Sequence, residues 1–282
     1  MRTPYLSLNI IFIILLSAVI FPRKGVSQAN EPEESRRVRD AIYYNIDQGF
    51  SWGLLTDDRM SNLHYQGPGA ILNFARRAHR PRYIAEWSFA RLRYNYSTPS
   101  HKGTVVENPA AGIRYMHLRK IYTPESYNIY IGGQVNVFGN FRLAGRLGNS
   151  YLYADLVGEI RPQAGFHTHS RFLWRDWNIE LSAAASLLGY TVRIPEYGVS
   201  FELGEDGGVK TQGFEQQVLL PYNYVNVTTG VFIREKFGGE SNPNWFRVGY
   251  LWDYYTMKGK HNLNTNNALH QLVLELYFMV RQ

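Results

Sequence analysis

The last fifteen residues of the chain, ALHQLVLELYFMVRQ (268–282), alternate between two sets of side chains. One set is wholly apolar and the other is mixed, with Leu272, Leu274, Leu276, Phe278 and Val280 in the first and Gln271, Val273, Glu275, Tyr277 and Met279 in the second. Successive side chains of a β-strand point to opposite faces. This pattern therefore predicts a strand that is apolar on one face and mixed on the other.

The same two-residue period recurs in at least eight segments upstream. The predicted strands are residues 42–54, 70–74, 82–96, 104–118, 127–142, 151–161, 177–190, 225–234, 246–255 and 268–282. Repeated alternating strands behind an export signal are typical of a transmembrane β-barrel, in which roughly 9–11 residues of each strand cross the bilayer. The predicted fold class is therefore all-β, a closed antiparallel transmembrane β-barrel of about ten strands, within a range of eight to twelve.

Two segments leave the strand count open. Residues 165–174 either extend the sixth strand or form one of their own, and a piece of the connection at 191–221 could add another. In the third strand the apolar face changes around Ala90, from Trp87 and Phe89 to Leu92 and Tyr94, so a β-bulge is expected there. Bacterial single-chain barrels have even strand numbers, and we favour ten over twelve.

The N-terminus has the features of a secretory signal. Arg2 precedes an apolar run at residues 10–21, and VSQA (26–29) offers small residues to a signal peptidase. The expected organisation is a signal peptide at 1–29, a polar periplasmic leader at 30–40 and one barrel domain at 41–282. The chain has no cysteine, which excludes disulfides and thiol catalysis. Twenty-one Tyr, fifteen Phe and six Trp suit the aromatic girdles of an integral protein in the outer membrane of a Gram-negative bacterium.

Acidic and basic side chains of similar number occupy the faces opposite the apolar ones. The predicted lumen-lining charges are Glu86, Arg114, Arg142, Asp155, Glu159, Glu180, Arg234, Arg247, Asp253 and Glu275. A lumen of about ten strands is only a little wider than one filled by side chains, so these groups are expected to pair across it. The interior should then be plugged or narrow, because an open pore needs of the order of 16–18 strands.

The connection at 191–221 interrupts the alternation. It contains Pro195, Pro221 and the acidic glycine-rich run Gly204, Glu205, Asp206, Gly207 and Gly208. A connection of this length is usually functional or disordered. We expect it to fold over or into one mouth of the barrel as a lid.

Catalytic and metal-binding patterns are weak in this sequence. In His167-Thr168-His169-Ser170 a strand would turn the serine away from both histidines, which disfavours a lipid hydrolase. Asp57 and Asp58 are adjacent and no Asp-x-His occurs, which disfavours a barrel protease. No third ligand accompanies the two histidines, and no phosphate-binding glycine motif is present. We therefore predict no catalytic residue, no metal and no cofactor.

The formal net charge of +7 is spread among acids, with no basic patch of the kind that nucleic acid requires. The chain resembles the small outer-membrane β-barrels of Bacteroidetes-type bacteria in its export signal, its Tyr-rich strands, the segment LLGYTVRIP (187–195) and the final hairpin at 245–282. Gln282 departs from the terminal aromatic residue common in barrel-insertion signals, although Tyr277 and Phe278 lie close to it. The expected partners are outer-membrane lipid, the insertion machinery acting through the C-terminal strand, and a small solute.

Three functional hypotheses follow. The first is a porin-like, non-enzymatic barrel for passage or capture of a small solute, or with a structural or partner-binding role. The second is a membrane-embedded, lipid-modifying hydrolase. The third is a soluble exported β-sandwich, which is disfavoured because sandwich strands are usually shorter than these.

Overall fold

The computed structural model describes the chain from Ala41 to Arg281, with gaps. The described residues are 41–98, 101–124, 127–144, 152–172, 175–193, 201–203, 209–211, 215–237, 244–259 and 264–281. The predicted signal peptide at 1–29, the leader at 30–40 and the glycine-rich run at 204–208 lie outside these ranges. Within the described residues no helix is long and apolar enough to cross a membrane.

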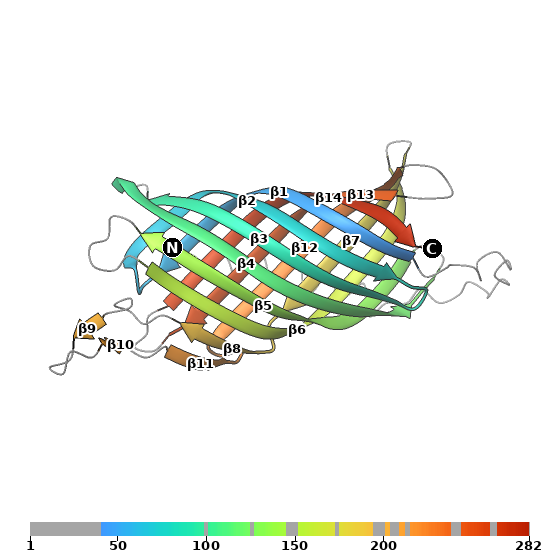
Figure 1. The fold of residues 1–282 in the computed structure, drawn as a ribbon. Helices are drawn as coiled ribbons and strands as arrows, with labels where there is room; N and C mark the ends of the chain where they lie inside the picture. Colours follow the sequence, from blue (N-terminus) through green and yellow to red (C-terminus); the bar gives the residue numbers. More distant parts are fainter. Residues whose placement is uncertain are drawn as a thin grey trace, which may run out of the picture. The chain divides into compact units, whose positions relative to one another are not determined.

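The described part of the chain forms fourteen strands (Figure 1). They are β1 (Ala41–Asp57), β2 (Ser61–His79), β3 (Tyr83–Thr98), β4 (His101–Tyr122), β5 (Tyr127–Ala144), β6 (Leu152–Phe172), β7 (Arg175–Ala185), β8 (Leu188–Arg193), β9 (Phe201–Leu203), β10 (Val209–Thr211), β11 (Glu215–Leu219), β12 (Tyr224–Phe237), β13 (Asn244–Lys258) and β14 (Asn264–Arg281).

Ten of these strands close into an antiparallel barrel, as predicted. They follow one another in the order β1 to β7, then β12, β13 and β14, and β14 pairs back onto β1. This last pairing runs the length of β1, from Ile42↔Arg281 to Asp57↔Thr265. Residues 165–172 belong to β6, so the first of the two interpretations of that segment is confirmed.

The barrel wall has one irregular place, where the neighbouring strands β7 and β12 both stop and the shorter strands β8 and β11 continue the wall. β6 pairs with β7 up to Gln163↔Ala184 and with β8 from Ile160↔Leu188, so β8 continues β7 with a register shift of one residue against β6. β11 pairs with β8 and leads into β12 through a turn in which the Leu220 N–H donates to Asn223 Oδ1 at 2.7 Å. The connection expected at 191–221 thus has strand at both ends, and β9 and β10 within it pair with each other.

The β-bulge predicted near Ala90 is wrong. β3 keeps one register with β4 from Tyr83↔Arg119 to Ser97↔Val105, and its burial alternates without a slip. Leu92 and Tyr94 therefore face inward, while Arg91 and Arg93 face outward. The error arose from assuming that apolar side chains always face lipid, whereas Tyr94 belongs to a buried cluster inside this barrel.

The outside of the barrel is apolar. Along β1 the even-numbered residues from Tyr44 to Leu54 are largely exposed and the odd-numbered ones largely buried. Exposed apolar side chains recur on the neighbouring strands, among them Leu72, Phe74, Trp87, Phe89, Ile113, Ile131, Val135, Val137, Phe141, Leu156, Ile160, Val231, Val248, Leu272 and Leu274. Only a closed sheet satisfies every backbone group in hydrocarbon. The chain is therefore an integral β-barrel of the outer membrane of a Gram-negative bacterium.

The two rims differ. β1 begins and β14 ends at one rim, which we call the terminus side. The β1–β2 turn and the long connection between β8 and β11 lie at the other rim, the loop side. Asp47 and Asp57 lie ten residues apart on β1, which corresponds to roughly 25 Å along a barrel with strands tilted by about 40°. That length matches the apolar band of an outer-membrane barrel.

Candidate functional site

The interior of the barrel is polar and charged. All ten predicted lumen-lining charges project inward: six are buried, three others line a central cavity, and Arg234 borders a smaller cavity at the terminus side. They do not form a single cluster. The charged side chains separate into a loop-side network, a terminus-side network and a group around the cavity between them.

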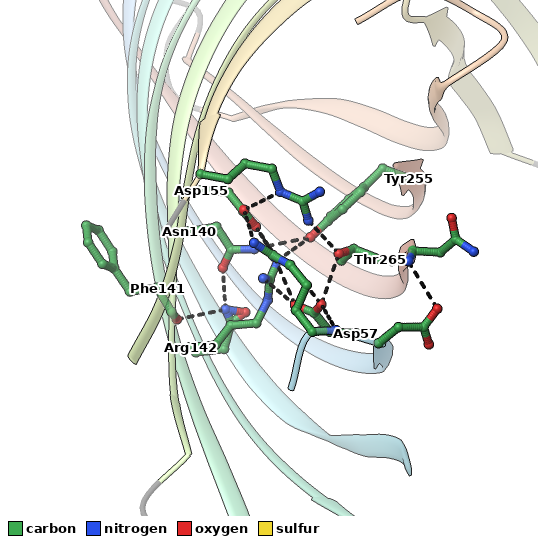
Figure 2. Close-up of polar contacts among 12 residues, drawn as sticks. Asp57, Asn140, Phe141, Arg142, Asp155, Tyr255 and Thr265 are labelled. Carbon is green, nitrogen blue, oxygen red and sulfur yellow. Dashed lines mark hydrogen bonds and ion pairs between the residues drawn. The ribbon is translucent and has the colours of Figure 1, made fainter. Parts of the chain in front are cut away.

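The loop-side network consists of Asp57, Arg59, Arg142, Asp155 and Arg193 (Figure 2). Arg142 bridges the two carboxylates, with 2.7 Å from Nη1 to Asp57 Oδ2 and 2.7 Å from Nη2 to Asp155 Oδ2. Arg59 also contacts both carboxylates, at 3.0 and 3.1 Å, and Arg193 Nε donates to Asp155 at 2.9 Å. Every one of these side chains is 1% exposed or less.

This network spans the full width of the lumen. Asp57 ends β1 and Asp155 lies on β6, and these strands are five apart around the ring in either direction. Tyr255 on β13 accepts a hydrogen bond from Arg142 at 3.0 Å, and Thr265 on β14 accepts one from Arg193 at 2.8 Å. Buried charges are tolerated only when they are paired and hydrogen-bonded. The network therefore closes the loop-side mouth with paired charges, three guanidiniums on two carboxylates.

Arg59 lies in the β1–β2 turn at this rim. Burial acts to lower the pKa of its guanidinium, but the carboxylates of Asp155 and Asp57 more than offset this and hold the pKa above its usual value. The guanidinium is therefore charged at every physiological pH.

Stacked tyrosines lie below the loop-side network. The rings of Tyr94 and Tyr96 are 5.5 Å apart and almost parallel, and both side chains are buried. Glycines make the room for them: a Cβ added to Gly69 would lie 2.2 Å from Tyr94 Cδ1, and one added to Gly53 would lie 2.6 Å from the Tyr96 hydroxyl. The absence of side chains on β1 and β2 at these points lets the rings lie flat against the wall.

The terminus-side network consists of Arg77, Glu86, Arg114, Glu180, Arg234, Arg247 and Glu275. Arg247 bridges Glu275 at 2.7 Å and Glu180 at 2.8 Å, and Glu180 also contacts Arg234 at 3.0 Å. Glu86 pairs with Arg114 at 2.8 Å and with Arg77 at 3.7 Å. The carboxylates are buried, but Arg234 is 22% exposed and Arg114 is 40% exposed. The cations of this network therefore reach water, unlike those of the loop side.

A cavity of about 290 Å³ lies between the two networks. Its wall is rich in carboxamides, including Asn108, Gln134, Asn136, Gln163, Asn226 and Gln271. Asp253 accepts a hydrogen bond from the Thr228 hydroxyl at 2.8 Å, and that hydroxyl in turn accepts one from Arg161 Nη2 at 2.5 Å. The wall also carries apolar side chains, among them Leu92, Met116, Phe138 and Phe232. The cavity therefore combines apolar surface with groups that can hydrogen-bond a molecule other than water.

Five charged residues of these groups were not predicted: Asp57, Arg59, Arg77, Arg161 and Arg193. Asp57 lies beyond the predicted strand at 42–54, although it continues the odd-numbered inward face of β1. Arg193 keeps the inward phase of Thr191 two residues earlier, and both are buried. Extending the two-residue period of each strand toward the loop side would therefore have predicted that Asp57 and Arg193 face the lumen. Arg59 lies outside any strand, and no periodicity could have found it.

Of the histidine candidates only His167 reaches these groups. His167 points inward, with Nδ1 3.9 Å from Glu180, whereas His169 and Ser170 are exposed. Among the described residues no cluster of three or more His, Asp or Glu could hold a metal ion. The expected lid residues, Gly204 to Gly208, lie outside the described part of the chain.

Comparisons with known proteins return structures only. No protein-family model matches the chain, and no curated protein matches it. The solved structures that are similar include the outer membrane protease OmpT of Escherichia coli, with 10% identity, a TM-score of 0.44, and coverage of 86% of this chain and 96% of that one. The translocator domain of the autotransporter NalP of Neisseria meningitidis has 10% identity and a TM-score of 0.39, with 97% and 96% covered. Ail of Yersinia pestis has 10% identity and a TM-score of 0.30, with 85% and 100% covered. Values of this size carry no inference about what this chain does.

Proposed function

We propose that this outer-membrane barrel is non-enzymatic and captures a small polar solute in its interior for gated passage, without being an open pore. The observation that carries the proposal is the cavity of about 290 Å³ between two ion-pair networks, whose partly apolar wall carries carboxamides and charged groups. A barrel that served only as a wall could fill this space with apolar side chains. A compartment lined by carboxamides and charges instead suits a hydrogen-bonding solute.

The terminus-side network is the better candidate for a gate. Its cations are partly exposed, so the pairs can be exchanged for water at a smaller cost than the fully buried pairs of the loop side. Arg247 holds Glu180 and Glu275 together. Loss of this one bridge should therefore loosen the barrier between the cavity and the periplasm.

Planar-bilayer conductance and liposome swelling test the proposal. Wild-type protein should lack the large steady conductance of a 16-stranded porin and should admit small polar solutes slowly. Arg247→Gln should raise the rate of swelling several-fold, whereas Glu107→Gln, in an exposed pair on the outer wall with Arg93, should not. A wide open wild-type pore would contradict the occlusion. Complete impermeability of both wild type and Arg247→Gln to every small polar solute would contradict passage.

The hydrolase alternative rests on the HTHS segment. The nucleophile it needs, Ser170, is exposed, and His167 on the inside contacts Glu180 and lies against the Tyr130 ring at a tilt of 42°. These positions do not favour transfer of a proton from Ser170 to His167, so we retain the non-enzymatic proposal.

A partner-binding role is a second candidate, favoured by the β8–β11 hairpin. Within the described residues β11 pairs only with β8, and the turn after it exposes 71% of Tyr222 and, on β11 itself, 52% of Val218. Deleting residues 194–214 and measuring solute uptake separates the roles. Unchanged uptake would leave the hairpin free for a partner, and altered uptake would make the connection the expected lid. We also keep a Bacteroidetes-type origin as a proposal, supported by the segment 187–195 and the final hairpin.

A further inference from the structure

Two charged side chains face the central cavity from opposite walls. Arg114 lies on β4 and Asp253 on β13, and these strands are five apart around the ring of ten in either direction. Both residues line the cavity. A molecule held there can therefore contact a cation on one side and a carboxylate on the other.

Asp253 differs from the carboxylates of the two networks. Glu86, Glu180 and Glu275 each have a guanidinium within 4 Å, whereas Asp253 has none that close among the described residues. Asp253 accepts a hydrogen bond from the Thr228 hydroxyl, and Arg161, which donates to that same hydroxyl, acts on it without direct contact. A carboxylate inside a barrel is costly without a cationic partner. Asp253 thus offers an oxygen to a positively charged donor arriving from the cavity.

Arg114 offers the complementary group. Its Nη2 contacts Glu86 at 2.8 Å and its Nε donates to Ser88 at 3.2 Å. The side chain nevertheless stays 40% exposed although it lies inside the barrel. The remaining N–H groups of the guanidinium can therefore donate to an anionic group, and a guanidinium fork matches a carboxylate in shape.

The wall beside Asp253 adds free acceptors. Gln163 and Asn226 both line the cavity, and each keeps an amide oxygen without a hydrogen-bond partner among the described residues. An ammonium group has three donors and no acceptor. It would satisfy one oxygen of Asp253 and still have donors for these two amide oxygens, which are buried and would have to turn toward the cavity.

We infer that the central cavity binds a small zwitterion of the α-amino-acid type, with its ammonium group on Asp253 and its carboxylate on Arg114. The volume of about 290 Å³ equals roughly ten waters at about 30 Å³ each, which accommodates such a molecule. A neutral polyol would leave Asp253 without a cation in direct contact, and a simple amine would leave the remaining N–H groups of Arg114 without a second anionic acceptor beside Glu86. This inference rests on the proposed capture function and specifies its substrate class.

Equilibrium dialysis of the refolded barrel in detergent tests the inference. The probes are radiolabelled L-leucine, its des-amino analogue 4-methylpentanoate, its descarboxy analogue 3-methylbutylamine, and mannitol. Leucine should bind at least tenfold more tightly than any of the other three, because only leucine pairs with both charges. This comparison uses wild-type protein and does not depend on any variant.

Two variants locate the contacts. Asp253→Asn should lower leucine affinity to that of 4-methylpentanoate while leaving 4-methylpentanoate unchanged, and Arg114→Gln should lower it to that of 3-methylbutylamine. The matched controls are Glu107→Gln and Arg93→Gln, which remove the same charges from the outer wall. Heat-dependent gel migration verifies that each variant has closed its barrel.

The outcomes separate this inference from the function beneath it. Leucine binding no tighter than that of its analogues would overturn the zwitterion site, and so would closed variants that bind leucine like wild type. If mannitol binds or passes in that case, the capture function stands without the zwitterion. If no solute binds and none passes, both fall.

Discussion

The two ends of this barrel are closed by the same kinds of side chain, packed in different ways. At the loop side two carboxylates hold three guanidiniums, and no side chain is more than 1% exposed. At the terminus side Glu86, Glu180 and Glu275 are buried, but the arginines around them are 11–40% exposed. An exposed ion pair contributes little to stability because water screens it. In a buried pair each charge depends on its partner, so removing one partner is strongly destabilising. The loop side therefore acts as a fixed plug and the terminus side as a looser barrier.

The largest expected effect comes from removing a shared carboxylate of the loop side. Asp155→Asn leaves three buried guanidiniums with only Asp57, so it should lower the free energy of unfolding by about 3–5 kcal/mol. Arg247→Gln, its counterpart at the terminus side, should cost less because Glu180 keeps Arg234 at 3.0 Å and water can enter where the 15% exposed guanidinium was removed. Urea unfolding of both variants in lipid vesicles measures the difference. Equal losses would show that the two closures do not differ in the way their exposure indicates.

A smaller effect is expected from the wall that supports the loop-side plug. Gly69→Ala places a Cβ 2.2 Å from the Tyr94 ring, which must shift, and overpacking of this kind costs about 1–3 kcal/mol. Gly139→Ala is the matched control, because its Cβ would meet nothing nearer than 3.7 Å, from Phe141 Cε2. The midpoint of urea unfolding should fall for the first variant and stay nearly constant for the second. A similar midpoint for both variants would mean that the stacked tyrosines do not support the loop-side plug.

Much of this fold was predictable because side chains of a membrane barrel alternate between lipid and lumen along each strand, and the sequence shows the same two-residue period. Leu272, Leu274 and Leu276 lie on the face opposite Glu275 and Tyr277, and that alternation alone assigns one face to lipid. The ten predicted charges likewise project inward because a charge on the lipid face is costly. The period fails where apolar rings are buried inside, as at Tyr94, and there it produced a bulge that the strand does not have.

The grouping of the charges could not be predicted. Whether Arg142 pairs with Asp57 or with a residue nearer the cavity depends on how far each strand is shifted against the next, and alternation does not contain that shift. Arg59 joins the loop-side network from a turn that folds back into the lumen, and the alternation of a strand does not predict such a contact. The position and size of the cavity likewise depend on the space that the two networks leave unfilled. All ten strands together determine that space.

The smallest expected effect belongs to the ion pair outside both closures. Arg93 and Glu107 face outward from β3 and β4 at 3.2 Å, with 62% and 49% of their side chains exposed. We place this pair in the aqueous or headgroup region toward the loop-side ends of β3 and β4, where water and salt screen it. Arg93→Gln or Glu107→Gln should then change the free energy of unfolding by less than about 0.5 kcal/mol, and 1 M salt should erase even that difference. Urea unfolding of the two single variants and the double variant gives the coupling energy. A coupling above about 1 kcal/mol would mean that exposure does not decide what an ion pair contributes in this barrel, and the contrast between its two ends would then need another cause.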